Sequence, residues 1–363
     1  MILTIFVFIG VLAILVLAHE FGHFLVARRN GVKVEEFGFG FPPKIFSKKI
    51  GDTIYSINLL PLGGFVKLYG EEGTNEQDPV SFASKSVGVR SKIVVAGVAM
   101  NFLLAIVLLT IGFWTGLVPM AELPKGAILK NVVLTVTSVV SGSPAEKSGL
   151  VSQDIIIKVD NVIFSNSEEF LSYIKTKAGK EVTLYVKNGK GGERQIQVTP
   201  RVSPPKDEGP LGISIETLHF ARLPFIKALS YALSGVFNFI SAFLSALFSL
   251  IKGIFVNGKV TGEVAGPVGI FVMVSQAITL GFGYLLNLIV LLSLTLAVIN
   301  IFPFPALDGG KFLFLIIEKI RGKKVATTIE NVIHTIGFIL LMLLILVITY
   351  RDIVKIVFGK PII

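Results

Sequence analysis

The sequence lacks cysteine and contains few charged residues. None of its 363 residues is cysteine, only 16% are Asp, Glu, Lys or Arg, and only four are histidine. Without thiols there can be no disulfide and no thiolate metal site, so a bound metal needs nitrogen and oxygen ligands. The scarcity of charge, against 52% hydrophobic residues and a mean hydropathy of +0.77, excludes an ordinary soluble chain. The sequence therefore predicts a membrane protein.

Apolar stretches with almost no charge recur along the chain. A bilayer core about 30 Å thick needs about 20 helical residues, and several of these stretches are long enough to span it. We expect an α-helical polytopic membrane protein with about four transmembrane helices. Its membrane core comprises residues 1–120 and 284–363, separated by a soluble insertion and by a segment at 223–283. That segment mixes Ser and Asn through its apolar pattern, which favours an interfacial amphipathic helix with no crossing.

Basic residues indicate the orientation of the chain. The stretches 28–92 and 311–324 carry most of the lysine and arginine that flank apolar runs, so both are expected on the cytoplasmic side. The net charge of +10 then reflects this bias and contact with anionic membrane lipid, and it needs no nucleic-acid partner. The first apolar run could be a cleaved signal, but it begins without a basic residue and Arg28 and Arg29 follow it. That order favours a retained helix.

A metal-binding pattern lies inside the first apolar run, in "LVLAHEFGHFLVA". On a helix, His19 and His23 face the same side, and Glu20 lies one position along. H-E-x-x-H is the metalloprotease arrangement, in which two neutral imidazoles hold zinc and the carboxylate takes a proton from water. The alternative is a chance match in which both histidines only pack. Three ionisable side chains within a membrane helix are costly, however, so zinc is the better explanation.

A catalytic zinc usually takes three protein ligands, so a third must come from elsewhere. His219 follows the soluble insertion and is expected on the opposite side of the membrane, whereas His334 opens the last apolar run. Asp308, in "NIFPFPALDGG", is the better candidate because it ends an apolar run just before a basic stretch, as the histidine pair does. The alternative role for Asp308 is to cap the helix that begins near Lys311.

Four motifs, in order along the chain, resemble the site-2 protease family of intramembrane zinc metalloproteases, in the branch that includes the regulator-of-sigma-E protease. They are "HEFGH" at 19–23, "PLGGFVKLYGE" at 61–71, "GPVGI" at 266–270 and "NIFPFPALDGG" at 300–310. The resemblance implies a multi-pass protein of the bacterial cytoplasmic (inner) membrane that cleaves single-pass membrane proteins, such as anti-sigma factors or remnant signal peptides. It implies Zn²⁺ held by His19, His23 and Asp308, with Glu20 as the catalytic base and Asn300 near the substrate or oxyanion.

The chain departs from the family pattern in three places. "GVAMNF" has Val98 where relatives often have proline, although Asn101, expected to contact substrate, is present. Thr295 stands where some relatives have a second asparagine, so a pair with Asn300 cannot be assumed. The soluble part has room for one PDZ-like module, whereas many Gram-negative relatives carry two.

Residues 121–222 read as this β-rich module, expected outside the cytoplasm. The part "SGSPAEKSGLVSQDIIIKVDNV" resembles a circularly permuted PDZ domain. In "GPLGISIE", Leu211, Gly212 and Ile213 resemble a carboxylate-binding loop and its strand. Backbone N–H groups there could capture a C-terminus, and a free strand edge could accept a peptide. The alternative is a cap that only excludes bulky proteins.

Residues 51–68, "GDTIYSINLLPLGGFVKL", alternate as strands do and predict a membrane-associated β-hairpin. An exposed edge near Gly63 and Gly64 could hold an extended substrate by main-chain hydrogen bonds. The alternative is an ordinary cytoplasmic hairpin.

The resulting hypothesis is a zinc endopeptidase that acts on single-pass membrane proteins, with its active site towards the cytoplasm. A zinc carrier or sensor, and a silent PDZ adaptor, would need the same ligands or the same module but not Glu20. The sequence leaves the oligomeric state, the substrate and the cleavage position open.

Overall fold

The computed structural model describes residues 1–73, 75–187, 192–205, 208–257 and 265–358, so part of the 223–283 segment lies outside it. The chain divides into two compact units. The first combines Met1–Val107, Leu233–Val272 and Ile289–Ile363, and the second combines Leu108–Ala232 and Met273–Leu288. We describe each by itself.

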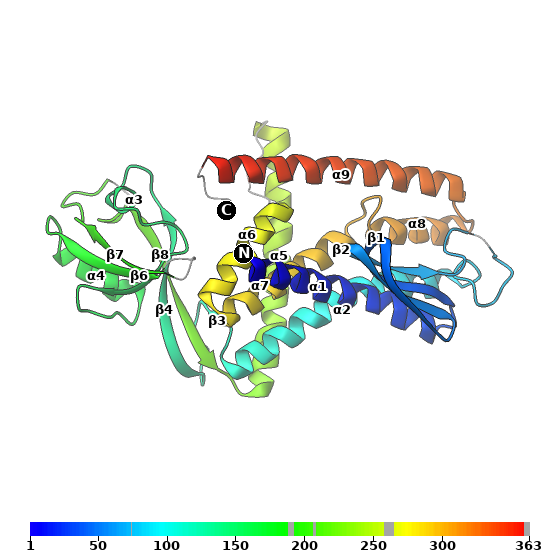
Figure 1. The fold of residues 1–363 in the computed structure, drawn as a ribbon, viewed down its shortest axis with the longest axis horizontal. Coiled ribbons are helices and arrows are strands. Elements are labelled where there is room, and N and C mark those ends of the chain that lie inside the picture. Colours follow the sequence, from blue (N-terminus) through cyan, green and yellow to red (C-terminus); the bar gives the residue numbers. More distant parts are fainter. Residues whose placement is uncertain (74, 188–191, 206–207, 258–264, 359–363) are drawn as a thin grey trace. The chain divides into compact units, whose positions relative to one another are not determined.

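Helices dominate the first unit (Figure 1). The long helices of the chain, several of which continue into the second unit, are α1 (Ile2–Arg29), α2 (Val87–Thr115), α5 (Phe225–Asn257), α6 (Pro267–Leu280), α7 (Phe282–Ile301), α8 (Asp308–Arg321) and α9 (Thr327–Val357). Five of these, α1, α2, α5 up to Ser249, α7 and α9, are long and apolar enough to cross a membrane. The expected polytopic architecture is therefore confirmed, while α5 adds a fifth candidate to the four spans predicted.

Helices α1 and α2 pack closely in the first unit because a glycine lies where they meet. A Cβ at Gly22 would lie 2.3 Å from the carbonyl oxygen of Ala96 and 3.0 Å from Cα of Gly97. Small residues allow two membrane helices to bring their backbones together in this way. The chain between the two helices packs against the C-terminal end of α1 and the N-terminal end of α2, where Phe24, Val34, Leu68 and Ile93 share one apolar cluster.

A long β-ribbon follows α1 and comprises β1 (Val34–Ile50) and β2 (Thr53–Leu68). Its turn lies at Gly51 and Asp52, so the ribbon begins before the hairpin that the sequence predicts over residues 51–68. Residues 36–39 pair with 64–67 along one edge and with 54–57 along the other, so the ribbon folds around this short segment. In the described residues no further strand pairs with the outer edge of 64–68. This open edge lies on a strand that packs against α1.

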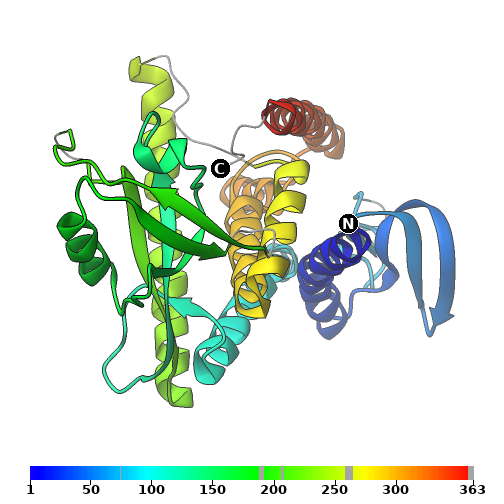
Figure 2. The same cartoon turned by 60° about the vertical axis from the view of Figure 1, so that its left-hand side comes forward.

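The second unit contains a six-stranded sheet in the order β3-β8-β4-β5-β6-β7. Its elements are β3 (Pro119–Met120), β4 (Ile128–Val139), α3 (Pro144–Lys147), β5 (Ile155–Val159), α4 (Ser167–Thr176), β6 (Val182–Lys187), β7 (Glu193–Val198) and β8 (Ile213–Arg222). Strands make up much of residues 121–222, as expected of a β-rich module. Phe170 and Ile174 of α4 are fully buried with Val136, Leu184 and other strand residues, so α4 covers one face of the sheet (Figure 2).

Candidate metal centre

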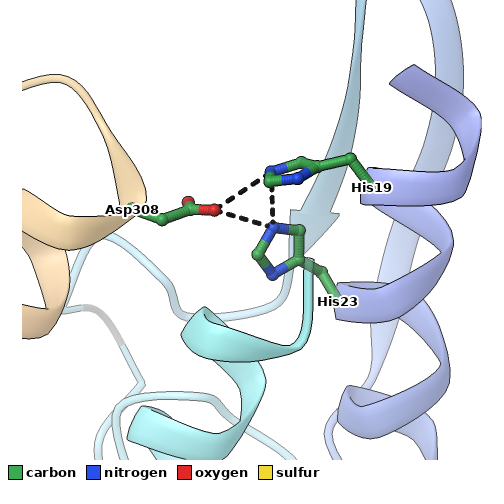
Figure 3. Close-up of side chains that lie close together, drawn as sticks. All are labelled: His19, His23 and Asp308. Atoms are coloured by element: carbon green, nitrogen blue, oxygen red, sulfur yellow. Dashed lines mark hydrogen bonds and ion pairs between the residues drawn. The ribbon is translucent and has the colours of Figure 1, made fainter. Parts of the chain in front are cut away.

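Two turns of α1 and the start of α8 bring three polar side chains to one point in the first unit (Figure 3). Nε2 of His19 and Nε2 of His23 are 3.2 Å apart. Oδ2 of Asp308 lies 3.0 Å from the first nitrogen and 3.2 Å from the second. Four residues separate the histidines, so one helix face presents both rings, as the sequence predicts.

The donor set and its spacing fit a zinc ion. Bonds of about 2.0–2.1 Å at tetrahedral angles place zinc ligand atoms roughly 3.3 Å apart. Among the described residues, Oδ2 of Asp308 is buried yet accepts no hydrogen bond of regular geometry from the two nitrogens beside it. A proton can bridge only one pair of these three atoms, whereas a cation at their centre attracts all three. The three residues could therefore hold a metal.

Asp308 is aimed at the histidines by the loop before it. It is the first residue of α8, while Leu307 occupies the N-cap position and no side chain caps the helix. The alternative role of Asp308 as an N-cap is therefore wrong. Burial acts to raise the pKa of the Asp308 carboxyl, but the two imidazoles beside it hold that pKa far below its usual range. Zinc binding requires the carboxylate form of this side chain.

Neighbouring backbone fixes the ring of His23. Its Nδ1 lies 2.8 Å from the carbonyl oxygen of Ile93, which can only accept, so Nδ1 carries the proton. Nε2 of the neutral ring then keeps a lone pair facing Asp308. Gly97, one turn further along α2, has no side chain where the rings lie: a Cβ there would be 2.3 Å from Nε2 of His23.

His334, which the sequence offered as an alternative third ligand, does not join the three converging side chains and instead contacts the loop before Asp308. Its Nδ1 accepts a hydrogen bond of 2.9 Å from the backbone N–H of Ala306, two residues before Asp308. Ala306 has a φ of 75°, a conformation that costs energy for a residue with a side chain. Helix α9 also packs on the preceding residue, because a Cβ at Gly337 would lie 2.4 Å from Cβ of Pro305. His334 therefore holds the loop that aims Asp308.

Replacing His334 tests this role. We expect His334→Phe to weaken zinc binding about tenfold or more, because the ring would still fill the space while Ala306 loses its acceptor. His334→Asn, whose side-chain oxygen can accept the same bond, should retain most of the affinity. Competition with a chromogenic chelator measures both variants. Equal affinity for zinc in His334→Phe and the wild type would contradict the role.

Glu20 lies beside the three converging residues and next to the β-ribbon. A Cβ at Gly64 would lie 3.2 Å from Cγ of Glu20, so this part of β2 passes directly over the glutamate. Lys311, one turn after Asp308, forms an ion pair of 2.6 Å with Glu71, and this neighbour raises the pKa of Lys311. Glu71 ends one sequence motif and Lys311 directly follows another, but their spacing of 240 positions gave no signal that they pair.

The other predicted site residues are dispersed. Asn300 is half-buried near the end of α7. Asn101 is fully buried, with Nδ2 3.4 Å from Nδ1 of His19, and its contact with substrate stays a prediction. In the second unit, Leu211 belongs to the core, Gly212 has a φ of 73° and Ile213 begins β8. His219 also lies on β8.

Comparison with known proteins places this sequence in a family. The sequence profile described as "Peptidase family M50" matches residues 7–344. The chain belongs to this family. A Clostridium acetobutylicum protein is 35% identical over 94% of each chain. "Zinc metalloprotease RasP" of Shouchella clausii is 30% identical, covering 97% of this chain and 99% of its own. "Regulator of sigma-W protease RasP" of Bacillus subtilis is 29% identical, covering 96% of this chain and 98% of its own.

Membership of family M50 confirms the resemblance to site-2 proteases. The protein is a zinc metalloprotease with several apolar helices, and Zn²⁺ is its cofactor. The activity therefore agrees with the prediction. The two alternative functions, a zinc carrier or sensor and a silent PDZ adaptor, are set aside.

Proposed function

We propose that this protease hydrolyses peptide bonds of single-pass membrane proteins within or beside the bilayer. The observation that carries the proposal is the convergence of His19, His23 and Asp308, two of them on a helix apolar enough to span a membrane. A substrate that is itself a membrane helix can reach such a site by lateral diffusion. Anti-sigma factors and remnant signal peptides are substrates of this kind.

The residues have separate roles in the proposed reaction. His19, His23 and Asp308 hold the zinc, which when bound supplies Lewis acidity to the scissile carbonyl. Glu20 accepts a proton from the attacking water and later returns it to the leaving nitrogen. The Asn300 amide donates a hydrogen bond to the oxygen that gains negative charge.

The β-ribbon supports binding of an extended substrate. A helical peptide shields its amide bonds, so it must unwind before an enzyme can cleave it. The open edge at 64–68 offers backbone groups to an unwound segment, and Gly64 places this edge next to Glu20. Gly63, with a φ of 101°, precedes it and packs against the ring of Phe41.

A polar cavity supports access of water from the side of the basic loops. The cavity has a volume of about 950 Å³ and includes Ala306, Lys311 and His334 in its lining. Four ion pairs also line it, namely Glu35 with Lys67, Glu71 with Lys311, Glu76 with Lys324 and Arg90 with Glu318. Such a wall favours water over lipid, and it begins one turn from Asp308.

A reconstituted assay with two substrates tests this function. In proteoliposomes, we expect cleavage of a single-pass substrate with a short outer segment, and loss of cleavage when a chelator removes zinc. A substrate with a folded outer domain should be cleaved at least about tenfold more slowly if the module at 121–222 restricts access. Deleting 135–214 should then equalise the two rates; Leu134 pairs with Thr217, so a short linker closes the gap.

Three results would count against these ideas. Cleavage that persists in the zinc-free enzyme would contradict the catalytic role of the centre. Cleavage outside the membrane-flanking region, located by mass spectrometry, would contradict the proposed substrate class. An equal loss of cleavage of both substrates after the deletion would mean that the module is needed for the structure of the unit that holds the metal centre.

The module could also bind a newly formed C-terminus. The edge of β8 beside Ile213–Leu218 is unpaired in the described residues, because β3 pairs only with His219 and Phe220. Helix α4 lies near this edge, since the Ser167 N–H donates to Oγ1 of Thr217. A strand edge beside a helix is the arrangement that PDZ domains use for peptides. The N–H of Gly212 already donates to Gly209, so other loop amides would have to hold the carboxylate.

For topology we propose that α1, α2, α7 and α9 span the cytoplasmic membrane, with the module outside. The first-unit part of α5 runs crosswise to α9 in both views (Figures 1 and 2), as a helix lying in the membrane plane would. The chain lacks cysteine, so single-cysteine variants report position without background. In intact cells, an impermeant thiol reagent should label Lys175→Cys and leave Ser47→Cys and Lys323→Cys unlabelled. The opposite pattern would invert the orientation.

A further inference from the structure

Asn101 is a buried polar residue that the proposed reaction does not use. It lies on α2, one helical turn after Gly97, so both residues face the same neighbours. Its side chain is fully buried, and its Nδ2 lies 3.4 Å from Nδ1 of His19. The Oδ1 atom of the same amide is also buried and has no hydrogen-bond partner. A buried amide with an unpaired end in a membrane helix is expensive, so its presence needs an explanation.

The chemistry of His19 determines what Asn101 must do. Nε2 of His19 faces Oδ2 of Asp308 at 3.0 Å, and it can bind zinc only if it is unprotonated. A neutral ring then carries its proton on Nδ1, as Ile93 enforces for His23. An amide NH₂ group cannot accept that proton, whereas an amide oxygen can. Because the two ends of an asparagine amide have nearly the same size, the pocket accommodates either orientation, and only one suits the ligand.

We propose that Asn101 is a positioning residue that turns Oδ1 towards His19 and accepts a hydrogen bond from Nδ1–H. This bond would fix the tautomer of His19 and orient its ring. Ser293 of α7 supports the arrangement, because its buried hydroxyl donates to the backbone carbonyl of Asn101 over 2.9 Å. The inference rests on the proposed zinc ligation by His19, and it explains why "GVAMNF" contains an asparagine in an apolar helix.

Three variants and zinc affinity test the proposal. Asn101→Leu keeps the size but removes the acceptor, and we expect zinc binding to weaken about 10- to 100-fold. Asn101→Asp keeps an oxygen acceptor, so it should retain the zinc affinity that Asn101→Leu loses. Ser293→Ala removes this support but keeps the acceptor, so it should weaken zinc binding less than Asn101→Leu does. Long-range ¹H–¹⁵N spectra of the zinc-loaded wild type should show the proton of His19 on Nδ1.

The outcomes separate this proposal from the metal centre itself. Wild-type affinity in Asn101→Leu, or equal weakening in Asn101→Leu and Asn101→Asp, would overturn the role of Asn101 while leaving the centre intact. If His23→Ala bound zinc as tightly as the wild type, the proposed ligands would be wrong and both ideas would fall. Thermal unfolding of the zinc-free variants identifies any that lose affinity because they do not fold. For such a variant, the spectra of the wild type decide: a proton on Nε2 of His19 would overturn the proposal.

Discussion

Glu20→Gln should lower the rate of peptide cleavage by about 10²- to 10⁴-fold and leave zinc in place. Glutamine has nearly the shape of glutamate but cannot accept a proton from water. Zinc should remain because Glu20 is not one of the three residues whose ligand atoms converge. Initial rates on a single-pass substrate in proteoliposomes and the zinc content of the purified protein measure the two effects.

The matched control for this variant is Glu72→Gln. Glu72 is an exposed carboxylate in the wall of the polar cavity, in the same unit as Glu20. The Glu72→Gln variant loses the same charge as Glu20→Gln. A cleavage rate close to that of the wild type would therefore show that general electrostatics do not explain the effect at Glu20. If the Glu20→Gln protein cleaved substrate at more than a tenth of the wild-type rate, the role of Glu20 as the catalytic base would be refuted. Loss of zinc would instead make Glu20 a ligand.

The sequence predicted most of the catalytic unit because two features act at short range. The spacing of His19 and His23 fixes one helix face, and the apolar runs indicate helices long enough to cross a membrane. Asp308 could also be chosen, because its position at the end of an apolar run matches the side and depth of the histidines. Strand segments in the module were visible because their alternation is local.

Tertiary contacts decided the features that the sequence could not predict. Nothing in the sequence near Asn101 indicates that its amide faces His19 rather than a substrate, because 82 residues separate them. His334 is equally plausible as a ligand and as a support until Ala306 is seen to donate to it. Helix α5 is apolar enough to span yet is interrupted by polar residues, so composition alone cannot give the number of spans.

Gly97→Ala should abolish detectable cleavage and weaken zinc binding by at least about 100-fold. The added methyl would lie 2.3 Å from Nε2 of His23 and 2.8 Å from Cε1 of His19, so at least one ring must move. The backbone of α2 cannot retreat easily, because Gly22 holds α1 against Ala96 and Gly97. The ligand atoms that lie 3.0–3.2 Å apart would therefore no longer converge.

Gly88→Ala separates this clash from the general effect of alanine in a helix. Gly88 lies on the same helix, and a Cβ there would have no neighbour within 4 Å. Alanine is favoured over glycine by about 1 kcal/mol in a helix interior, where Gly97 lies, and Gly88 lies in the first turn, so neither substitution should weaken α2 itself. A loss of zinc in Gly97→Ala alone must then come from displacement of the imidazoles. Measuring zinc by competition in both variants decides the point: wild-type affinity in Gly97→Ala would mean that the rings can bind metal from another position, and that the close approach of α2 does not shape the centre.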